Sequence, residues 1–147
     1  MNELYYTDDH LANILSSTKT IAMVGASPNS ARASHLTMKY LQSKGYRVIP
    51  VNPEATGTIL LDEIVYARLL DIPVPIDMVD IFRNSEAAGT ITDEALLLAE
   101  RMSIQTIWMQ LGVRNDSAAR RAVAAGLNIV MDRCPKIEID RLFGAIG

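Results

Sequence analysis

The chain has 147 residues, of which 49% are hydrophobic and 21% are charged, and its formal net charge is −3. A chain of this length and composition is typical of a globular protein that buries its own core, so we expect a single domain over residues 1–147. The net negative charge disfavours a general nucleic-acid-binding protein, which usually carries a basic excess. The single cysteine, Cys134, excludes a disulfide framework and a paired-cysteine metal site.

The sequence also disfavours a secreted protein and a membrane-spanning protein. Residues 1–6 lack the basic segment and the apolar run of a signal peptide. No apolar stretch in the sequence approaches the roughly 20 residues that cross a membrane. We therefore expect a cytoplasmic protein with no membrane partner.

The predicted elements begin with a short helix that starts at residues 7–9, where acids occupy the first turn. Leu11, Ile14 and Leu15 lie on one face of this helix, which indicates that it packs on a core. A hydrophobic strand follows at residues 21–24.

The second predicted helix covers residues 34–44. Its apolar residues Leu36, Tyr40 and Leu41 are expected to face the sheet. Gly45 follows directly and is a typical stop for a helix.

The middle of the chain is less regular. A second strand is predicted at residues 47–51, and residues 54–76 form a loop with a short helix or strand near 60–70. A third strand at residues 78–82 and a long helix at residues 86–102 follow.

The C-terminal part repeats the alternation. A fourth strand is predicted at residues 106–111, and a helix opens with the capping sequence at residues 115–117. A fifth strand covers residues 128–131, and Pro135 suits the first position of a final helix. Strands alternating with helices favour right-handed crossovers, so we expect a doubly wound, Rossmann-like α/β domain of about five parallel strands with helices on both faces.

The clearest functional signal lies between His10 and Pro53, where the sequence contains no Asp or Glu but five Lys and Arg residues. Within this segment the first strand runs into a loop of small and polar residues and then into a helix. Such a turn presents backbone N–H groups and the positive end of a helix dipole, which favours a phosphate. The candidate phosphate-binding residues are Gly25, Ala26, Ser27, Asn29, Ser30, Arg32 and Ser34. For Arg32 the alternative is an exposed arginine at a helix start, and Ser34 also suits a helix N-cap.

Further candidates follow from the ends of the other strands, because ligands of such sheets lie beyond the carboxyl ends at the switch point of strand order. They are Val51, Asn52, Pro53, Phe82, Arg83, Gln110 and Gly112. Phe82 is favoured as a core residue over an adenine-stacking one. For Arg83, an ion pair with Asp80 or Glu86 is as good a hypothesis as a ligand contact.

Dinucleotide binding is disfavoured but stays an alternative. The loop after the first strand has Gly25 alone instead of three glycines, and Asn52 stands where NAD-binding sheets place an acid. Glu54 lies close enough to take that role. A small NAD(P)-dependent oxidoreductase is therefore the second hypothesis. A receiver-type signalling module is disfavoured, because this chain lacks the paired acids after the first strand and the phosphorylatable aspartate after the third.

Catalytic groups are scarce. The only histidines, His10 and His35, are not accompanied by a recognisable nucleophile and acid. Cys134 at a predicted helix N-terminus is either reactive or a buried inert thiol. No metal-ligating cluster is recognisable.

Five strand ends together carry a family resemblance over roughly residues 8–142. The residues that carry it are 24–27, Arg32, Ser34, 50–53, 80–84, 108–113 and 132–135. In these positions the chain resembles the small stand-alone CoA-binding proteins and the CoA-binding domain of the succinyl-CoA synthetase α subunit. Ala33 departs from the proline that many relatives carry there.

The resemblance implies that CoA is held through its nucleotide end. Residues 25–32 would surround phosphates, Asn52 and Pro53 would border the adenosine, and Phe82 with Arg83 would line the groove. Gln110 and Gly112 would approach the pantetheine arm.

The synthetase domain with the phosphorylated histidine has no counterpart here, so we expect no catalytic activity of the chain's own. The resemblance implies that the ligand is CoA or an acyl-CoA, and that an acyl-CoA-using enzyme is a candidate partner. The oligomeric state, a homodimer included, stays open.

Overall fold

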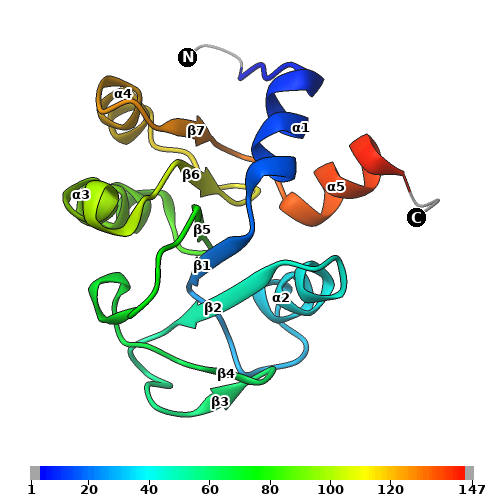
Figure 1. Ribbon diagram of the computed structural model, residues 1–147, viewed down its shortest axis with the longest axis vertical. Coiled ribbons are helices and arrows are strands. Elements are labelled where there is room, and N and C mark those ends of the chain that lie inside the picture. Colours follow the sequence, from blue (N-terminus) through cyan, green and yellow to red (C-terminus); the bar gives the residue numbers. More distant parts are fainter. Residues whose placement is uncertain (1–3, 145–147) are drawn as a thin grey trace.

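The computed structural model describes residues 4–144 and is built on one five-stranded parallel sheet (Figure 1). In spatial order its strands are β2 (Arg47–Val51), β1 (Thr20–Val24), β5 (Met78–Ile81), β6 (Thr106–Met109) and β7 (Asn128–Val130). Every neighbouring pair is parallel. The expectation that residues 1–6 are not a signal peptide falls partly outside this range, because residues 1–3 are not described.

Helices cover both faces of the sheet (Figure 1). On one face lie α1 (Asp8–Ser17), α2 (Ala33–Ser43) and α5 (Pro135–Phe143), and on the other α3 (Ser85–Met102) and α4 (Asp116–Ala124). Along β6, Trp108 packs beneath the first set, Met109 packs beneath the second, and both are fully buried. This confirms the predicted doubly wound, Rossmann-like fold. Within the described residues, no helix is both long and apolar enough to cross a membrane.

Helix α2 differs from the prediction in where it begins and in which face it buries. It starts at Ala33, so Ser34 lies in the first turn and is not the N-cap. Leu36 is 53% exposed, and the prediction that it faces the sheet is wrong. The buried positions are instead Ser34, Thr37, Met38 and Leu41. Because about 3.6 residues make one turn, a helix anchored through Met38 and Leu41 turns position 36 to solvent.

The irregular segment after β2 contains a hairpin of β3 (Ile59–Leu60) and β4 (Glu63–Ile64), followed by the short 3₁₀ helix η1 (Leu69–Asp71). The hairpin turns at Leu61 and Asp62, whose φ angles are positive although neither is glycine. A bridge between Val51 and Tyr66 then returns the chain to the end of β2. Residues 67–69 therefore lie at the carboxyl edge of the sheet.

Asp80 is an acid enclosed in the core. It lies in β5 between Met23 of β1 and Trp108 of β6, and it is fully buried. Neither of its carboxyl oxygens has a hydrogen-bond partner within residues 4–144. Desolvation penalises the charged form and raises the pKa of Asp80 well above its ordinary value of 3.8. Asp80 is therefore not the ion-pair partner that one hypothesis assigned to Arg83.

Replacing Asp80 with asparagine is expected to stabilise the protein increasingly as the pH rises. Above about pH 4 the unfolded chain releases the Asp80 proton while the folded protein retains it. The free energy of unfolding of the wild type therefore falls by about 1.4 kcal/mol per pH unit until the raised folded-state pKa is reached. Asparagine carries no such proton, so the difference between variant and wild type grows over this window. Urea unfolding at about pH 5 and about pH 8 measures it, and a pH-independent difference would contradict a protonated Asp80.

Candidate functional site

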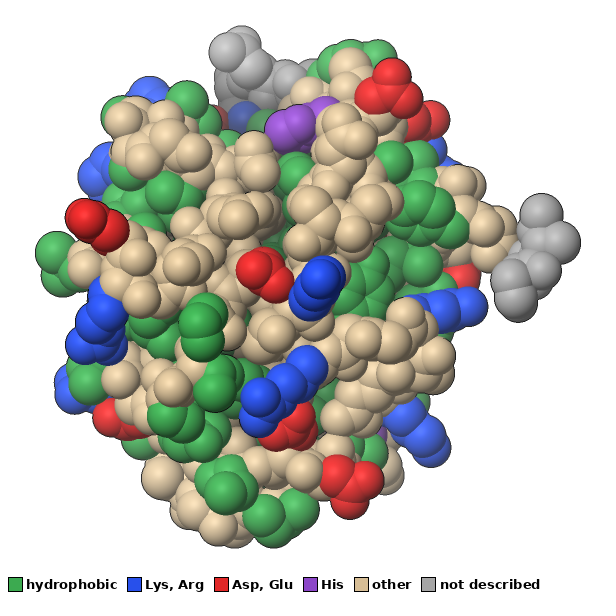
Figure 2. All heavy atoms as spheres, viewed as in Figure 1, with side chains coloured by type: hydrophobic (Ala, Val, Ile, Leu, Met, Phe, Trp, Pro, Cys, Tyr) green, Lys and Arg blue, Asp and Glu red, His purple; other side chains and the backbone are tan. Residues whose placement is uncertain are grey.

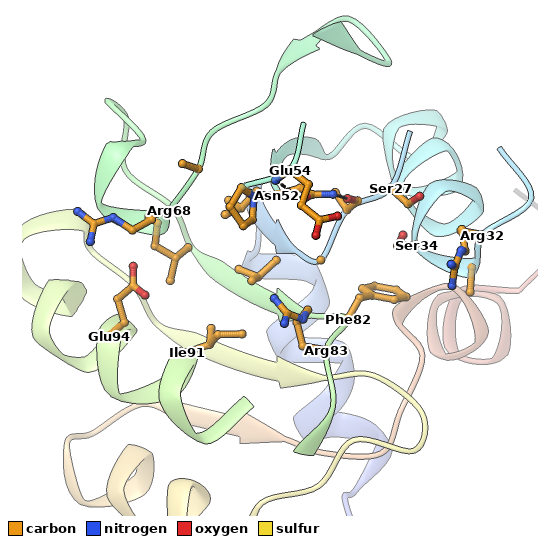
Figure 3. A pocket seen from close by; sticks show the side chains of 18 residues that line it. Ser27, Arg32, Ser34, Asn52, Glu54, Arg68, Phe82, Arg83, Ile91 and Glu94 are labelled. Atoms are coloured by element: carbon orange, nitrogen blue, oxygen red, sulfur yellow. Dashed lines mark hydrogen bonds between the residues drawn. The ribbon is translucent and has the colours of Figure 1, made fainter. Parts of the chain in front are cut away.

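A cavity of about 670 Å³ lies at the carboxyl ends of β1, β2 and β5. Strand β1 is flanked by β2 on one side and β5 on the other, so the cavity lies at the switch point of strand order. Figure 3 shows that the cavity is elongated. Ser27 and Arg32 lie at one end, Arg68 and Glu94 at the other, and Arg83 between them.

Gly25 makes the turn out of β1 into the cavity. Its φ angle is +95°, and its N–H donates a hydrogen bond to the carbonyl oxygen of Val51 at 3.0 Å. A Cβ atom at this position would lie 2.4 Å from the carbonyl oxygen of Phe82. Both the backbone conformation and the contact with β5 therefore require glycine.

The loop that follows Gly25 is held by its own polar groups. The Ser27 hydroxyl accepts a hydrogen bond from the N–H of Asn29 at 3.1 Å. The Asn29 side chain accepts a hydrogen bond from the N–H of Ala31 at 3.0 Å. The backbone carbonyl oxygen of Asn29 accepts one from the N–H of Arg32. Asn29 and Ser30 are exposed and do not line the cavity. The structure therefore gives Asn29 a role in shaping the loop.

The first turn of α2 faces the cavity without a capping side chain. Its N-cap is Arg32, whose side chain has no hydrogen-bond acceptor. Within the described residues, the N–H groups of Ala33, Ser34 and His35 have no hydrogen-bond acceptor. By contrast, α1, α3 and α4 are capped by Thr or Asn side chains. Free N–H groups, a helix dipole and a guanidinium at one place favour an anion.

Asn52 joins the loops after β1 and β2. Its Nδ2 donates to the carbonyl oxygen of Ala26 at 2.8 Å, and its Oδ1 accepts from the N–H of Glu54 at 2.9 Å. Both ends of the side chain are thus used within the protein. Asn52 shapes the cavity wall and positions Pro53 beside it.

Most of the predicted site residues meet at this cavity. Those that line it are Gly25, Ala26, Ser27, Arg32, Ser34, Val51, Asn52, Pro53, Phe82 and Arg83. Gln110 and Gly112 do not line it, because they follow β6, which lies beyond β5 from β1. The N–H of Gly112 instead donates to Asp132 at 2.7 Å.

Sequence reasoning missed part of the lining. The additional lining residues are Val24, Ala33, Glu54, Ala67, Arg68, Leu69, Ile91 and Glu94, and the sequence pointed to ligand binding only for Glu54. Ile91 and Glu94 are three residues apart on α3, a spacing that places them on one helix face and was available as a signal. Arg68 had no such signal, since it lies in the irregular segment.

Charged groups of both signs border the cavity. Arg32, Arg68 and Arg83 are basic, and Glu54 and Glu94 are acidic. On the face of the molecule seen in Figure 2, acidic and basic side chains are interspersed and form no broad basic surface. The cavity is therefore suited to a ligand with distinct anionic and uncharged parts.

The histidine and cysteine side chains nearest to this edge of the sheet do not line the cavity. The His35 ring contacts the carbonyl oxygen of Ser27 through Nδ1 at 3.0 Å and does not line the cavity. Cys134 is buried at the N-cap of α5, also outside the lining. Residues 4–144 contain no group of three or more His, Cys, Asp or Glu residues arranged to hold a metal ion.

Fold and site together define a Rossmann-like α/β domain with a polar cavity at its topological switch point. Residues 19–140 match the CoA binding domain family, and the chain belongs to that family. The resemblance drawn from the strand ends is thereby confirmed.

The chain is also similar to individual proteins. The uncharacterized protein YneT of Bacillus subtilis (strain 168) is 33% identical over 127 residues, which cover 86% of this chain and 90% of YneT. A hypothetical protein from Pyrococcus horikoshii OT3 is 36% identical with a TM-score of 0.87, over 98% of this chain and all of that one (100%). The dinucleotide-forming acetyl-coenzyme A synthetase 1 of Ca. Korarchaeum cryptofilum shares the fold alone. It is 21% identical with a TM-score of 0.61, over 76% of this chain and 25% of the synthetase chain.

Proposed function

We propose that this protein binds CoA or an acyl-CoA in the cavity, with the phosphates at the loop of residues 25–27 and at the first turn of α2. One observation carries the proposal: an uncapped helix N-terminus and Arg32 face a cavity in a chain of the CoA binding domain family. The acid-free segment between His10 and Pro53 removes local repulsion against a polyanion.

The proposed contacts follow from the donors available. The N–H groups at the start of α2 and the Arg32 guanidinium bind phosphate oxygens, and the Ser34 hydroxyl lies in the same turn. Arg83 lies midway along the cavity and reaches a second phosphate (Figure 3). The pantetheine arm leaves through the open side of the cavity. Gln110 and Gly112 contact the ligand only along that outgoing arm.

We further propose that the protein binds its ligand without transforming it. The cavity lining described above contains the hydroxyl groups of Ser27 and Ser34 and the carboxylates of Glu54 and Glu94, but neither His nor Cys, so it lacks the usual pairing of a nucleophile with a histidine. Holding CoA or an acyl-CoA for an acyl-CoA-using partner enzyme fits such a site.

Calorimetric titration with CoA, 3′-dephospho-CoA, acetyl-CoA and NAD tests the proposal. CoA is expected to bind with a Kd on the order of micromolar or tighter, and 3′-dephospho-CoA about tenfold more weakly because it lacks one phosphate. The acetyl-CoA titration shows whether an acyl group is accepted.

Binding of NAD in place of CoA would favour the alternative, an NAD(P)-dependent oxidoreductase, for which Glu54 at the cavity is the specific observation. Failure of all four ligands to bind would contradict the proposed function.

A further inference from the structure

The end of the cavity remote from Arg32 has a different chemical character. Figure 3 shows Glu94 rising from α3 beside Arg68, with Ile91 close by. The Oε1 atom of Glu94 is buried and has no hydrogen-bond partner within residues 4–144. No ion pair joins Glu94 to Arg68 in this part of the chain. Because Glu94 lines the cavity, a rotation of its side chain would present this unpartnered acceptor to a ligand.

A carboxylate accepts hydrogen bonds and repels phosphates, so it favours a hydrogen-bond donor on a part of the ligand remote from the phosphates. The cavity also has apolar walls: Leu69, Ile91, Val24 and Val51 are buried, line it and belong to one hydrophobic cluster. Apolar walls with one acceptor suit a flat heteroaromatic ring that carries an amino group.

We propose that Glu94 is a specificity-determining residue that accepts a hydrogen bond from the exocyclic amino group of the nucleobase. The inference rests on the proposed function and deepens it, because it specifies the orientation of the ligand in the cavity. Phosphates lie at the Arg32 end and the aminopurine ring at the Glu94 end. An oxopurine presents a carbonyl oxygen at the same place, which the carboxylate repels.

The test compares CoA with its 6-oxo analogue, in which hypoxanthine replaces adenine, by calorimetric titration. Wild-type protein is expected to bind CoA at least about tenfold more tightly than the analogue, the scale of one charge-assisted hydrogen bond. In the Glu94→Gln variant the amide both donates and accepts, so the ratio of the two dissociation constants is expected to fall to near one. Glu100→Gln is the matched control: it makes the same chemical change on an exposed position of α3 outside the cavity.

Each other outcome overturns the assignment. Equal weakening of both ligands by Glu94→Gln would place the carboxylate on a group they share, such as a ribose hydroxyl. An unchanged ratio with normal CoA binding would leave the proposed function standing and remove Glu94 from recognition. If wild-type protein binds neither ligand, the proposed function itself fails and this inference fails with it.

A purely structural role for Glu94 is distinguished by urea unfolding. An ion pair with Arg68 formed in solution would make Glu94→Gln less stable without altering the ratio of dissociation constants. That result would contradict the proposal.

Discussion

The Gly25→Ala variant is expected to lose about 3 kcal/mol or more of its free energy of unfolding and to lose CoA binding. Two costs combine at this position. Alanine at a φ of +95° is strained, and its Cβ would lie 2.4 Å from the Phe82 carbonyl oxygen. That oxygen belongs to backbone at the end of β5, so relief of the contact must push β1 and β5 apart beneath the cavity.

Gly45→Ala is the matched control. Gly45 has nearly the same φ, +94°, but no atom lies within 4 Å of its added Cβ, and it lies outside the cavity. It should cost only the conformational strain, about 1 kcal/mol, and leave CoA binding intact. Urea unfolding and calorimetric titration measure the two effects. Equal destabilisation of both variants would refute the contact with Phe82 as a source of strain.

The Arg32→Glu variant is expected to weaken CoA binding about 100-fold or more while leaving the fold as stable as the wild type. Loss of charge-assisted hydrogen bonds and the new repulsion together are worth about 3 kcal/mol of binding free energy. Arg32 is exposed at the N-cap of α2, where a carboxylate interacts favourably with the helix dipole. Binding is therefore expected to weaken without any loss of stability.

Lys39→Glu controls for net charge. Lys39 is exposed on the same helix, and the charge reversal is identical, but it does not line the cavity. Its effect on Kd is expected to stay within about threefold at moderate salt, because salt screens an exposed charge that makes no direct contact with the ligand. If Lys39→Glu weakened binding as much as Arg32→Glu, the phosphate contact proposed for Arg32 would be refuted.

Local sequence signals were sufficient for most of the fold. The hydrophobic runs identified all five strands of the sheet, and Asn84 and Asn115 start helices because their side chains accept from first-turn N–H groups. The hairpin at Leu61 and Asp62 was missed because its turn residues adopt positive φ without the glycine or asparagine that normally indicates such a turn. Its conformation is held by contacts distant in sequence, such as Gln42 Nε2 donating to the carbonyl oxygen of Leu61 at 2.9 Å.

By itself, the sequence determined the succession of strands and helices along the chain and the position of the loop that we propose binds phosphate. Those properties depend on periodicity, capping and the charges of consecutive residues, all of which act locally. Only the tertiary structure decided that Leu36 faces solvent, that Asp80 is enclosed without a partner, and that Glu94 meets Arg68 at one cavity. Each depends on how α2, α3 and the segment before η1 pack on the sheet. Such packing joins residues far apart in the chain, and no local pattern records it.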